Sequence, residues 1–260
     1  MKIVILCGGL GTRLREETEY RPKPMVEIGG KPILWHIMKT YAHYGFSDFV
    51  LCLGYRGNMI KEYFLNYRPM VSDFSIVLGS QGEQVRYHSD HDERDFSVTM
   101  VDTGLETMTG GRLKRVEPYI DGDTFMATYG DGLADIDIRK LLEFHRAHGK
   151  TATVTAIRPT SRFGGIDIGP GNEVMSFREK PRSEDWISGG FFVFNRKMLD
   201  CLDENCTLER EPLSNLARDG QLMAYRHDGF WQAMDTYREY KYLNELWDQR
   251  QAPWKVWEKP

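Results

Sequence analysis

KIVILCGGLGTRL, at residues 2–14, is the stretch that decides the fold. Residues 2–7 form a continuous apolar run, which is typical of a parallel strand buried on both faces. Gly8, Gly9 and Gly11 follow directly, and without Cβ atoms they let backbone N–H groups approach a phosphate closely. The stretch therefore predicts a buried first strand and a phosphate-binding turn. A glycine-rich turn without a ligand is the alternative.

Strand and helix patterns alternate after this turn. Pro32 opens a helical segment, residues 49–53 form the next apolar run, Asn58 can cap a second helix, and residues 74–78 predict a further strand. Alternation at this spacing is typical of a parallel sheet covered by helices. We therefore expect an α/β protein with a three-layer α/β/α architecture and a mixed, mostly parallel, doubly wound sheet.

The second half of the chain places Asp131 at the end of a strand. Residues 124–129 predict a strand that stops at Gly130-Asp131-Gly132, and ligands of open α/β sheets bind outside the carboxyl ends of strands. Further strands are expected at 97–102, 152–157, 173–178, 190–194 and near 222–226, and helices from Gly111, from Asp137, around Leu213 and from about 237.

We predict one domain over residues 1–260, because no repeat or linker-like composition divides the chain. It carries a strand-rich insertion around residues 80–115 and a C-terminal helical tail around residues 237–260. In that tail Trp247, Trp254 and Trp257 are expected to pack on this chain or on a second copy.

Composition and charge exclude several classes of protein. The 260 residues are 41% hydrophobic and carry a net charge of −4, which excludes wholesale disorder and a general nucleic-acid binder. No apolar run approaches the roughly 18 residues of a membrane span, and the first run is too short for a signal peptide. Four cysteines without metal-site spacing read as reduced thiols of a cytoplasmic protein: Cys7, Cys52, Cys201 and Cys206.

Two cations near the start of the chain suit a phosphate ligand. Arg13 offers a rigid fork of donors, and Pro22 and Pro24 stiffen the backbone around Lys23. A solvated lysine is the alternative at this position. Two known phosphate motifs fit badly. No Lys-Ser/Thr pair completes a Walker A sequence, and Leu14 stands where a dinucleotide-binding turn has its third glycine.

With these motifs, the sequence resembles the sugar-phosphate nucleotidyltransferases. The likeness covers essentially the whole chain, in order, and rests on GGLGTRL (8–14), PKPM (22–25), YGDG (129–132), EKP (179–181), GGF (189–191) and WQAMDT (231–236). The cytidylyl subfamily is resembled most closely in three segments, residues 25–39, 108–116 (MTGGRLKRV) and 231–236. Ser188 departs from the pattern, because an asparagine is expected before Gly189.

The resemblance implies transfer of a cytidylyl group from CTP to α-D-glucose 1-phosphate, with Mg2+ as cofactor, giving CDP-glucose and pyrophosphate for bacterial surface polysaccharide. It also suggests a homo-oligomer and no nucleic-acid or membrane partner. A uridylyl- or thymidylyltransferase is the nearest alternative. Alternatives of other classes are a non-catalytic regulatory module that binds sugar nucleotides and a dinucleotide-dependent oxidoreductase.

Residue roles follow from the same resemblance. Arg13, Lys23 and Asp131 would be catalytic, and Asp131 and Asp235 would hold the metal ion. Glu179, Lys180 and Gly190 would bind the sugar phosphate. Thr107 and Arg112 would choose the base, within a nucleotide-binding set of Leu6, Gly8, Gly9, Leu10, Gly11, Thr12, Arg13, Lys23, Thr107, Arg112 and Gly130.

Two histidine-containing segments are given no such role. His88, Asp90, His91, Asp92 and Glu93 could suggest a metal cluster, but their charged surroundings favour a solvated loop. His145 and His148 lie together on a predicted helix, without a third ligand.

Overall fold

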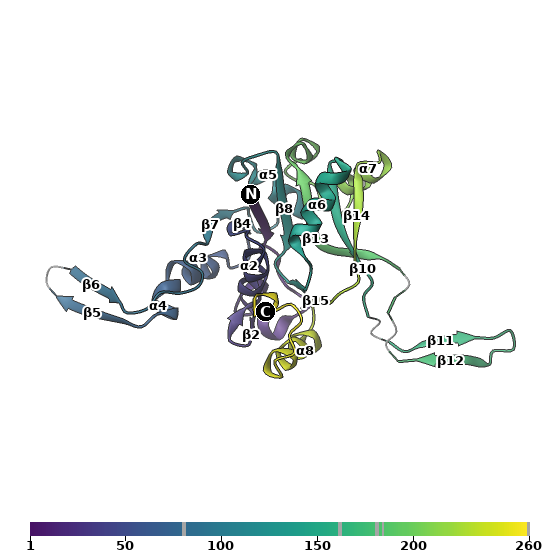
Figure 1. Cartoon of the computed structure of the whole chain (residues 1–260), viewed down its shortest axis with the longest axis horizontal. Coiled ribbons are helices and arrows are strands. Elements are labelled where there is room, and N and C mark those ends of the chain that lie inside the picture. Colours follow the sequence, from purple (N-terminus) through teal and green to yellow (C-terminus); the bar gives the residue numbers. More distant parts are fainter. Residues whose placement is uncertain (80–81, 161–162, 180–181, 184, 259–260) are drawn as a thin grey trace.

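The computed structural model describes residues 1–79, 82–160, 163–179, 182–183 and 185–258. A seven-stranded sheet lies at its centre, in the order β14-β10-β13-β8-β1-β4-β7 (Figure 1). The strands are β1 (Lys2–Leu6), β4 (Asp48–Leu53), β7 (Ser97–Asp102), β8 (Thr124–Tyr129), β10 (Ala152–Ile157), β13 (Ile187–Asn195) and β14 (Leu222–His227).

The sheet is mixed and mostly parallel, as expected. β1 pairs in parallel with β4 and β8, β4 with β7, and β10 with β14. β13 runs antiparallel to both of its neighbours, β8 and β10. Because β1 lies inside the sheet, Ile3, Val4 and Ile5 are fully buried, which explains the continuous apolar run in the sequence.

Helices cover both faces of the sheet. Ile3 and Ile5 of β1 belong to a core cluster that includes residues of α2 (Ile33–His43), α3 (Gly57–Leu65), α6 (Ile138–His148) and α8 (Tyr237–Asp248). Val4 points the other way, into a cluster that includes residues of α5 (Thr109–Arg115) and α7 (Glu211–Arg218). This alternation along β1 is what a sheet between two helical layers requires. The three-layer α/β/α architecture is therefore confirmed.

Two antiparallel hairpins project from opposite sides of the sheet (Figure 1). One consists of β5 (Phe74–Gly79) and β6 (Gly82–Tyr87), the other of β11 (Gly165–Ile168) and β12 (Val174–Arg178). The strand expected at 74–78 forms, but its expected place among the sheet strands is wrong. Pairing with the next stretch of chain closes a short loop and costs less entropy than joining a distant sheet edge. In the segment expected as a strand-rich insertion, β6 belongs to a hairpin and β7 to the sheet.

Short elements complete the fold. Two small strand pairs are β2 (Glu27–Ile28) with β3 (Lys31–Pro32), and β9 (Gly132–Ala134) with β15 (Trp231–Ala233). The short helices are α1 (Arg15–Thr18), α4 (Tyr67–Val71) and four 3-10 turns, Lys23–Met25, Glu117–Tyr119, Arg196–Cys201 and Val256–Glu258. Asp137 caps α6 as expected, because its carboxylate accepts from the Lys140 N–H. Of the described helices, none has both the length and the apolar character to cross a bilayer.

The C-terminal tail packs on its own chain. Trp254 is fully buried, and its Nε1–H donates to Nδ1 of His36 at 3.4 Å. Because an indole nitrogen can only donate, Nδ1 accepts, and Nε2 of His36 carries the proton that it donates to the Ile28 carbonyl at 2.9 Å. The ring of Trp247 also meets His36, with centroids 4.8 Å apart. A neutral histidine therefore joins α2 to the β2–β3 pair and the tail.

Acid is expected to weaken this contact. Burial lowers the pKa of His36 to about 4, whereas an unfolded histidine titrates near pH 6.5. The unfolded chain then binds a proton that the folded chain does not, so the free energy of unfolding falls as the pH drops through this window, by at most about 3 kcal/mol. Urea unfolding near pH 7.5 and near pH 5 measures the fall. His36→Gln keeps a donor and an acceptor but does not titrate, so its fall should be smaller. An equal fall in both proteins would contradict the assignment.

Candidate functional site

A cavity of about 370 Å³ opens at the carboxyl ends of β1 and β8. Loops that follow parallel strands meet at this edge, so residues far apart in the sequence line one space. Most of the predicted site residues are among them: Leu6, Gly8, Gly9, Gly11, Thr12, Arg13, Lys23, Thr107, Arg112, Gly130 and Asp131. The structure thus brings the glycine turn, the Lys23 segment, the 107–112 segment and the end of β8 together.

The glycine turn is held in shape by the chain that follows it. Gly11 has a φ of +64°, in the left-handed region that favours glycine, and a Cβ there would lie 2.8 Å from Cγ2 of Thr18. The Thr18 hydroxyl bonds to the carbonyls of Gly11 at 2.9 Å and Leu14 at 2.7 Å. The turn therefore needs glycine at position 11 for its backbone as well as for close approach of a ligand.

Lys23 joins the two carboxylates that were expected to hold a metal ion. Its Nζ lies 2.6 Å from Asp131 Oδ2 and 2.5 Å from Asp235 Oδ1. Pro22 precedes the 3-10 turn Lys23–Met25 and the buried Pro24 lies within it, so the two prolines flank Lys23. Burial lowers the pKa of Lys23, but the attraction of Asp131 and Asp235 outweighs it, so the pKa is raised above its ordinary value. The ammonium is therefore charged when the chain is folded.

A small strand pair carries Asp235 to this place. β15 pairs with β9, which directly follows Asp131, and the Met234 N–H donates to the Asp131 carbonyl at 2.9 Å. The capping box of α8 fixes the backbone beyond, because the Glu239 carboxylate accepts from the N–H groups of Asp235 and Thr236. Asp235 Oδ2 then lies 2.9 Å from Arg13 Nη1, although the two residues are 222 positions apart.

Arg112 lies behind the glycine turn, and only 4% of its surface is exposed. Its two terminal nitrogens donate to five acceptors at the end of β4 and on the loops that follow β1 and β7. These acceptors are Leu53 O, Thr103 Oγ1, Gly104 O, Gly8 O and Leu105 O, at 2.8–3.1 Å. Burial lowers the pKa of Arg112. Arg112 therefore braces the turn from behind, and its expected role in base choice stays a prediction.

The remaining predicted residues lie elsewhere. Leu10 is 52% exposed and is absent from the cavity lining. Gly190 has a φ of +76° and makes room for the ring of Tyr129, which a Cβ would overlap. Glu179 follows β12 at the base of a hairpin and does not line the cavity, and Lys180 falls outside the described residues. Sugar-phosphate binding by Glu179, Lys180 and Gly190 stays a prediction.

Sequence reasoning missed a pair of residues at the rim. Tyr129 and Thr109 line the cavity, and both donate to the carboxylate of Glu209. Tyr129 stands inside the YGDG motif and could have been found there. Glu209 carries no local signal, because its partners lie 80 and 100 residues away.

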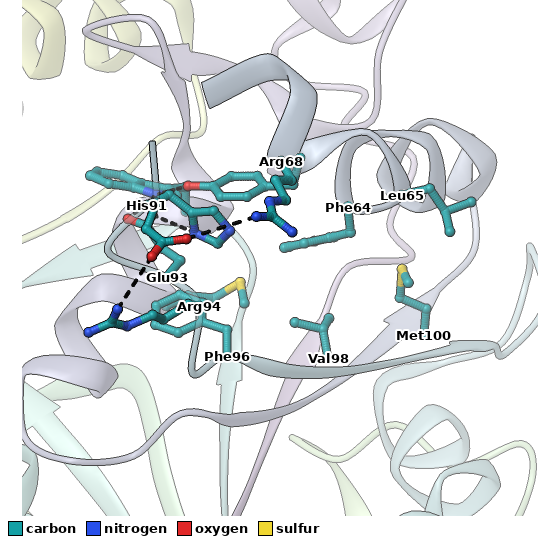
Figure 2. A pocket seen from close by; sticks show the side chains of 13 residues that line it. Phe64, Leu65, Arg68, His91, Glu93, Arg94, Phe96, Val98 and Met100 are labelled. Carbon is teal, nitrogen blue, oxygen red and sulfur yellow. Dashed lines mark hydrogen bonds and ion pairs between the residues drawn. The ribbon is translucent and has the colours of Figure 1, made fainter. Parts of the chain in front are cut away.

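A second, larger cavity, of about 510 Å³, shares no lining residue with the first cavity. Figure 2 shows Phe64 and Leu65 of α3 across from Val98 and Met100 of β7. At one end, Glu93 Oε1 accepts from Trp35 Nε1 at 3.1 Å and lies 3.2 Å from Lys39 Nζ. The Glu93 side chain is only 9% exposed, so the expected solvated loop is wrong at this residue. Across the described residues, no group of three or more His, Cys, Asp or Glu could hold a metal ion.

Comparison with known proteins identifies relatives along the whole chain. The family model described as nucleotidyl transferase matches residues 2–235. A glucose-1-phosphate cytidylyltransferase from Salmonella typhimurium is 54% identical over 261 residues, covering 99% of this chain and 100% of that protein. A probable glucose-1-phosphate cytidylyltransferase from Bacillus subtilis is 47% identical over 259 residues, with 99% and 100% covered.

A solved structure shares the fold. HddC from Yersinia pseudotuberculosis superposes with a TM-score of 0.69 at 22% identity, covering 95% of this chain and 99% of that one. That protein has also been crystallised in complex with GMP-PN.

The packing of Arg112 against Gly8 yields a stability test. In Gly8→Ala the new Cβ would overlap the buried guanidinium and break bonds to charged donors, so we expect a loss of about 2–4 kcal/mol in the free energy of unfolding. Gly9→Ala is the matched control, because no heavy atom beyond Gly9 and its two chain neighbours lies within 4 Å of the new Cβ position. Its change should stay within about 1 kcal/mol. Chemical unfolding measures both, and equal losses would show that Arg112 does not brace the turn.

Proposed function

The chain belongs to the nucleotidyl transferase family, and on that premise we propose that it transfers the cytidylyl group of CTP to α-D-glucose 1-phosphate, releasing pyrophosphate and forming CDP-glucose. One observation carries the proposal: Lys23 bridges Asp131 and Asp235 beside Arg13, at the mouth of the glycine turn. The names of the two cytidylyltransferase relatives support the choice of nucleotide and sugar.

The reaction needs alignment and charge cancellation more than proton transfer. The attacking phosphate has a second pKa near 6 and is largely dianionic at neutral pH, so it requires no general base. Two crowded anions must instead be held in line at the α-phosphorus. The cavity offers two cations, Arg13 and Lys23, to cancel this negative charge. It also offers the glycine turn around Gly8 and Gly11 to hold the phosphates.

Lys23 and Arg13 change partners when the triphosphate binds. The Lys23 side chain is only 12% exposed and its ammonium already lies between two carboxylates, so it would meet the α-phosphate and the incoming phosphate, where negative charge builds up. Arg13 is 74% exposed at its side chain and free to reach outward, to the β- and γ-phosphates and the departing pyrophosphate.

The residues present fit a Mg2+ ion. Asp131 and Asp235 both point at one cation, the Lys23 ammonium, which shows that this position already favours positive charge. Two carboxylates with the oxygens of a triphosphate are a typical donor set for Mg2+. Bound there, the ion would neutralise part of the triphosphate charge. Asp131 and Asp235 would hold it, and the Met234 N–H bond to the Asp131 carbonyl keeps the two carboxylates adjacent.

Base recognition is proposed at the 107–112 segment. Thr107 and Arg112 line the same cavity as Gly8 and Gly9, and the base end of CTP would lie beside them. The Thr107 hydroxyl is held by Arg115 Nη1 at 2.9 Å, which fixes its direction. Glu179, Lys180 and Gly190 are proposed for the sugar phosphate on the family resemblance.

We also propose a homo-oligomer. Isolated two-stranded hairpins are at best marginally stable in water, yet the two hairpins expose Leu78 at 78% and Phe177 at 66%. Packing against further copies would cover these side chains. A cytoplasmic location is proposed because Cys7, Cys52, Cys201 and Cys206 form no disulfide.

Nucleotide choice can be measured directly. With glucose 1-phosphate and Mg2+, we expect pyrophosphate release to be faster with CTP than with UTP or dTTP, by about tenfold or more in kcat/KM. Equal or faster turnover with UTP would overturn the cytidylyl assignment. No turnover with any nucleoside triphosphate would favour a non-catalytic binding module.

The role of Asp131 can be tested with a single substitution. Asp131→Asn keeps the shape of the side chain but removes the charge, so we expect kcat to fall by about a thousandfold or more while the Tm changes little. Asp121→Asn, on an exposed loop, is the matched control and should retain activity. Unchanged turnover in Asp131→Asn would rule out its proposed role in holding the metal ion.

A further inference from the structure

Glu209 holds two residues of the cavity rim in place. Its Oε2 accepts from the Thr109 hydroxyl at 2.6 Å, and its Oε1 accepts from the Tyr129 hydroxyl. The Thr109 oxygen in turn accepts from the Leu208 N–H at 2.9 Å, which fixes the direction of its own proton. Burial and the Glu209 carboxylate raise the pKa of Tyr129, so the phenol remains protonated and donates. The carboxylate is thus held by one donor on each oxygen.

Glu209 is not itself among the residues that line the cavity, but its two partners, Thr109 and Tyr129, both are, so the carboxylate lies next to the proposed nucleotide site. Thr109 begins α5, in the segment proposed for the base, and Tyr129 ends β8, two residues before Asp131. The ribose of a nucleotide connects its base to its phosphates. If the base lies at 107–112 and the α-phosphate at Lys23 and Asp131, the ribose lies beside Thr109 and Tyr129.

Electrostatics makes a carboxylate here unexpected unless it has a ligand of its own. A negative charge beside a triphosphate site repels the substrate and lowers its affinity. Glu209 is nevertheless exposed, so it is not required to fill the core. An ionised carboxylate has about four lone-pair positions. With Thr109 and Tyr129 bound, each oxygen retains room for one further donor, which matches the two adjacent hydroxyls of a ribose.

We propose that Glu209, fixed by Thr109 and Tyr129, forms a subsite for a vicinal diol and reads the 2′- and 3′-hydroxyls of the nucleotide's ribose. The inference rests on the proposed function, because it uses the placement of the base and phosphates. It predicts that the enzyme distinguishes ribonucleotides from deoxyribonucleotides and that Glu209 is the source of this distinction.

The hexose is a second source of the same chemistry. The ring of Tyr129 also packs against Gly190, which is proposed for the sugar phosphate, so a glucose hydroxyl could approach the same carboxylate. The ribose is favoured because Glu209 contacts Thr109 in the segment proposed for the base, and Thr109 lines the cavity with Gly8 and Gly9.

The subsite can be tested by removing the Glu209 charge from the enzyme and, separately, each ribose hydroxyl from the substrate. We would measure kcat/KM for CTP, 2′-deoxy-CTP and 3′-deoxy-CTP with wild type and with Glu209→Gln. In wild type we expect each deoxynucleotide to be about 10- to 100-fold poorer than CTP, mainly in KM. In Glu209→Gln, kcat/KM for CTP should fall by a similar factor, whereas kcat/KM for the deoxynucleotides should change little. The ratio of kcat/KM for CTP to that for each deoxynucleotide should therefore approach one.

Controls separate this outcome from a structural effect. Glu211→Gln removes an exposed carboxylate two residues away and should keep the wild-type distinction, and Tm values report folding of both variants. Parallel loss with CTP and both deoxynucleotides would overturn the subsite. If Glu209→Gln lowers kcat/KM with glucose 1-phosphate but not with 2-deoxy- or 3-deoxyglucose 1-phosphate, Glu209 contacts the hexose, and the ribose assignment is overturned. Absence of CTP turnover in wild type would instead refute the proposed function.

Discussion

The bridge from Lys23 to Asp131 and Asp235 is the interaction on which the site depends. It joins a lysine from the first 3-10 turn, an aspartate at the end of β8 and an aspartate before α8. Each partner alone would be costly to hold half-buried, and together they balance part of one another's charge. Opposite charges are thus held in contact beside the glycine turn.

The architecture around this bridge follows from the sheet. Parallel strands end at one edge, so the glycine turn after β1 and Asp131 after β8 must lie near each other. Arg112 then joins the turn to the end of β4 and to the loop after β7 by five hydrogen bonds. The side chain expected to read a base is thus first a structural brace that holds the glycine-rich turn in one shape.

Two segments show how local pattern and tertiary context diverge. The composition of residues 74–78 correctly predicts a strand, but nothing in it says whether its partner is the sheet or the adjacent β6. Glu93 lies in a run of charged residues that predicts a solvated loop, yet its side chain is only 9% exposed, and Trp35 and Lys39 provide it with a donor and an opposite charge. In the first case two partners would satisfy the same strand pattern. In the second case the partners lie more than 50 residues away in the sequence.

The sequence by itself determined the buried first strand, the glycine turn, the proline-enclosed Lys23 and the position of Asp131 after a strand, because these depend on neighbours within a few residues. The alternation of strands and helices likewise determined the layered architecture. Only the tertiary structure decided that Asp235 meets Lys23, that Arg112 faces inward, and that Glu209 joins Thr109 to Tyr129. Those contacts depend on which strands pair and where distant loops meet, and pairing of β15 with β9 has no local sequence signal strong enough to predict it.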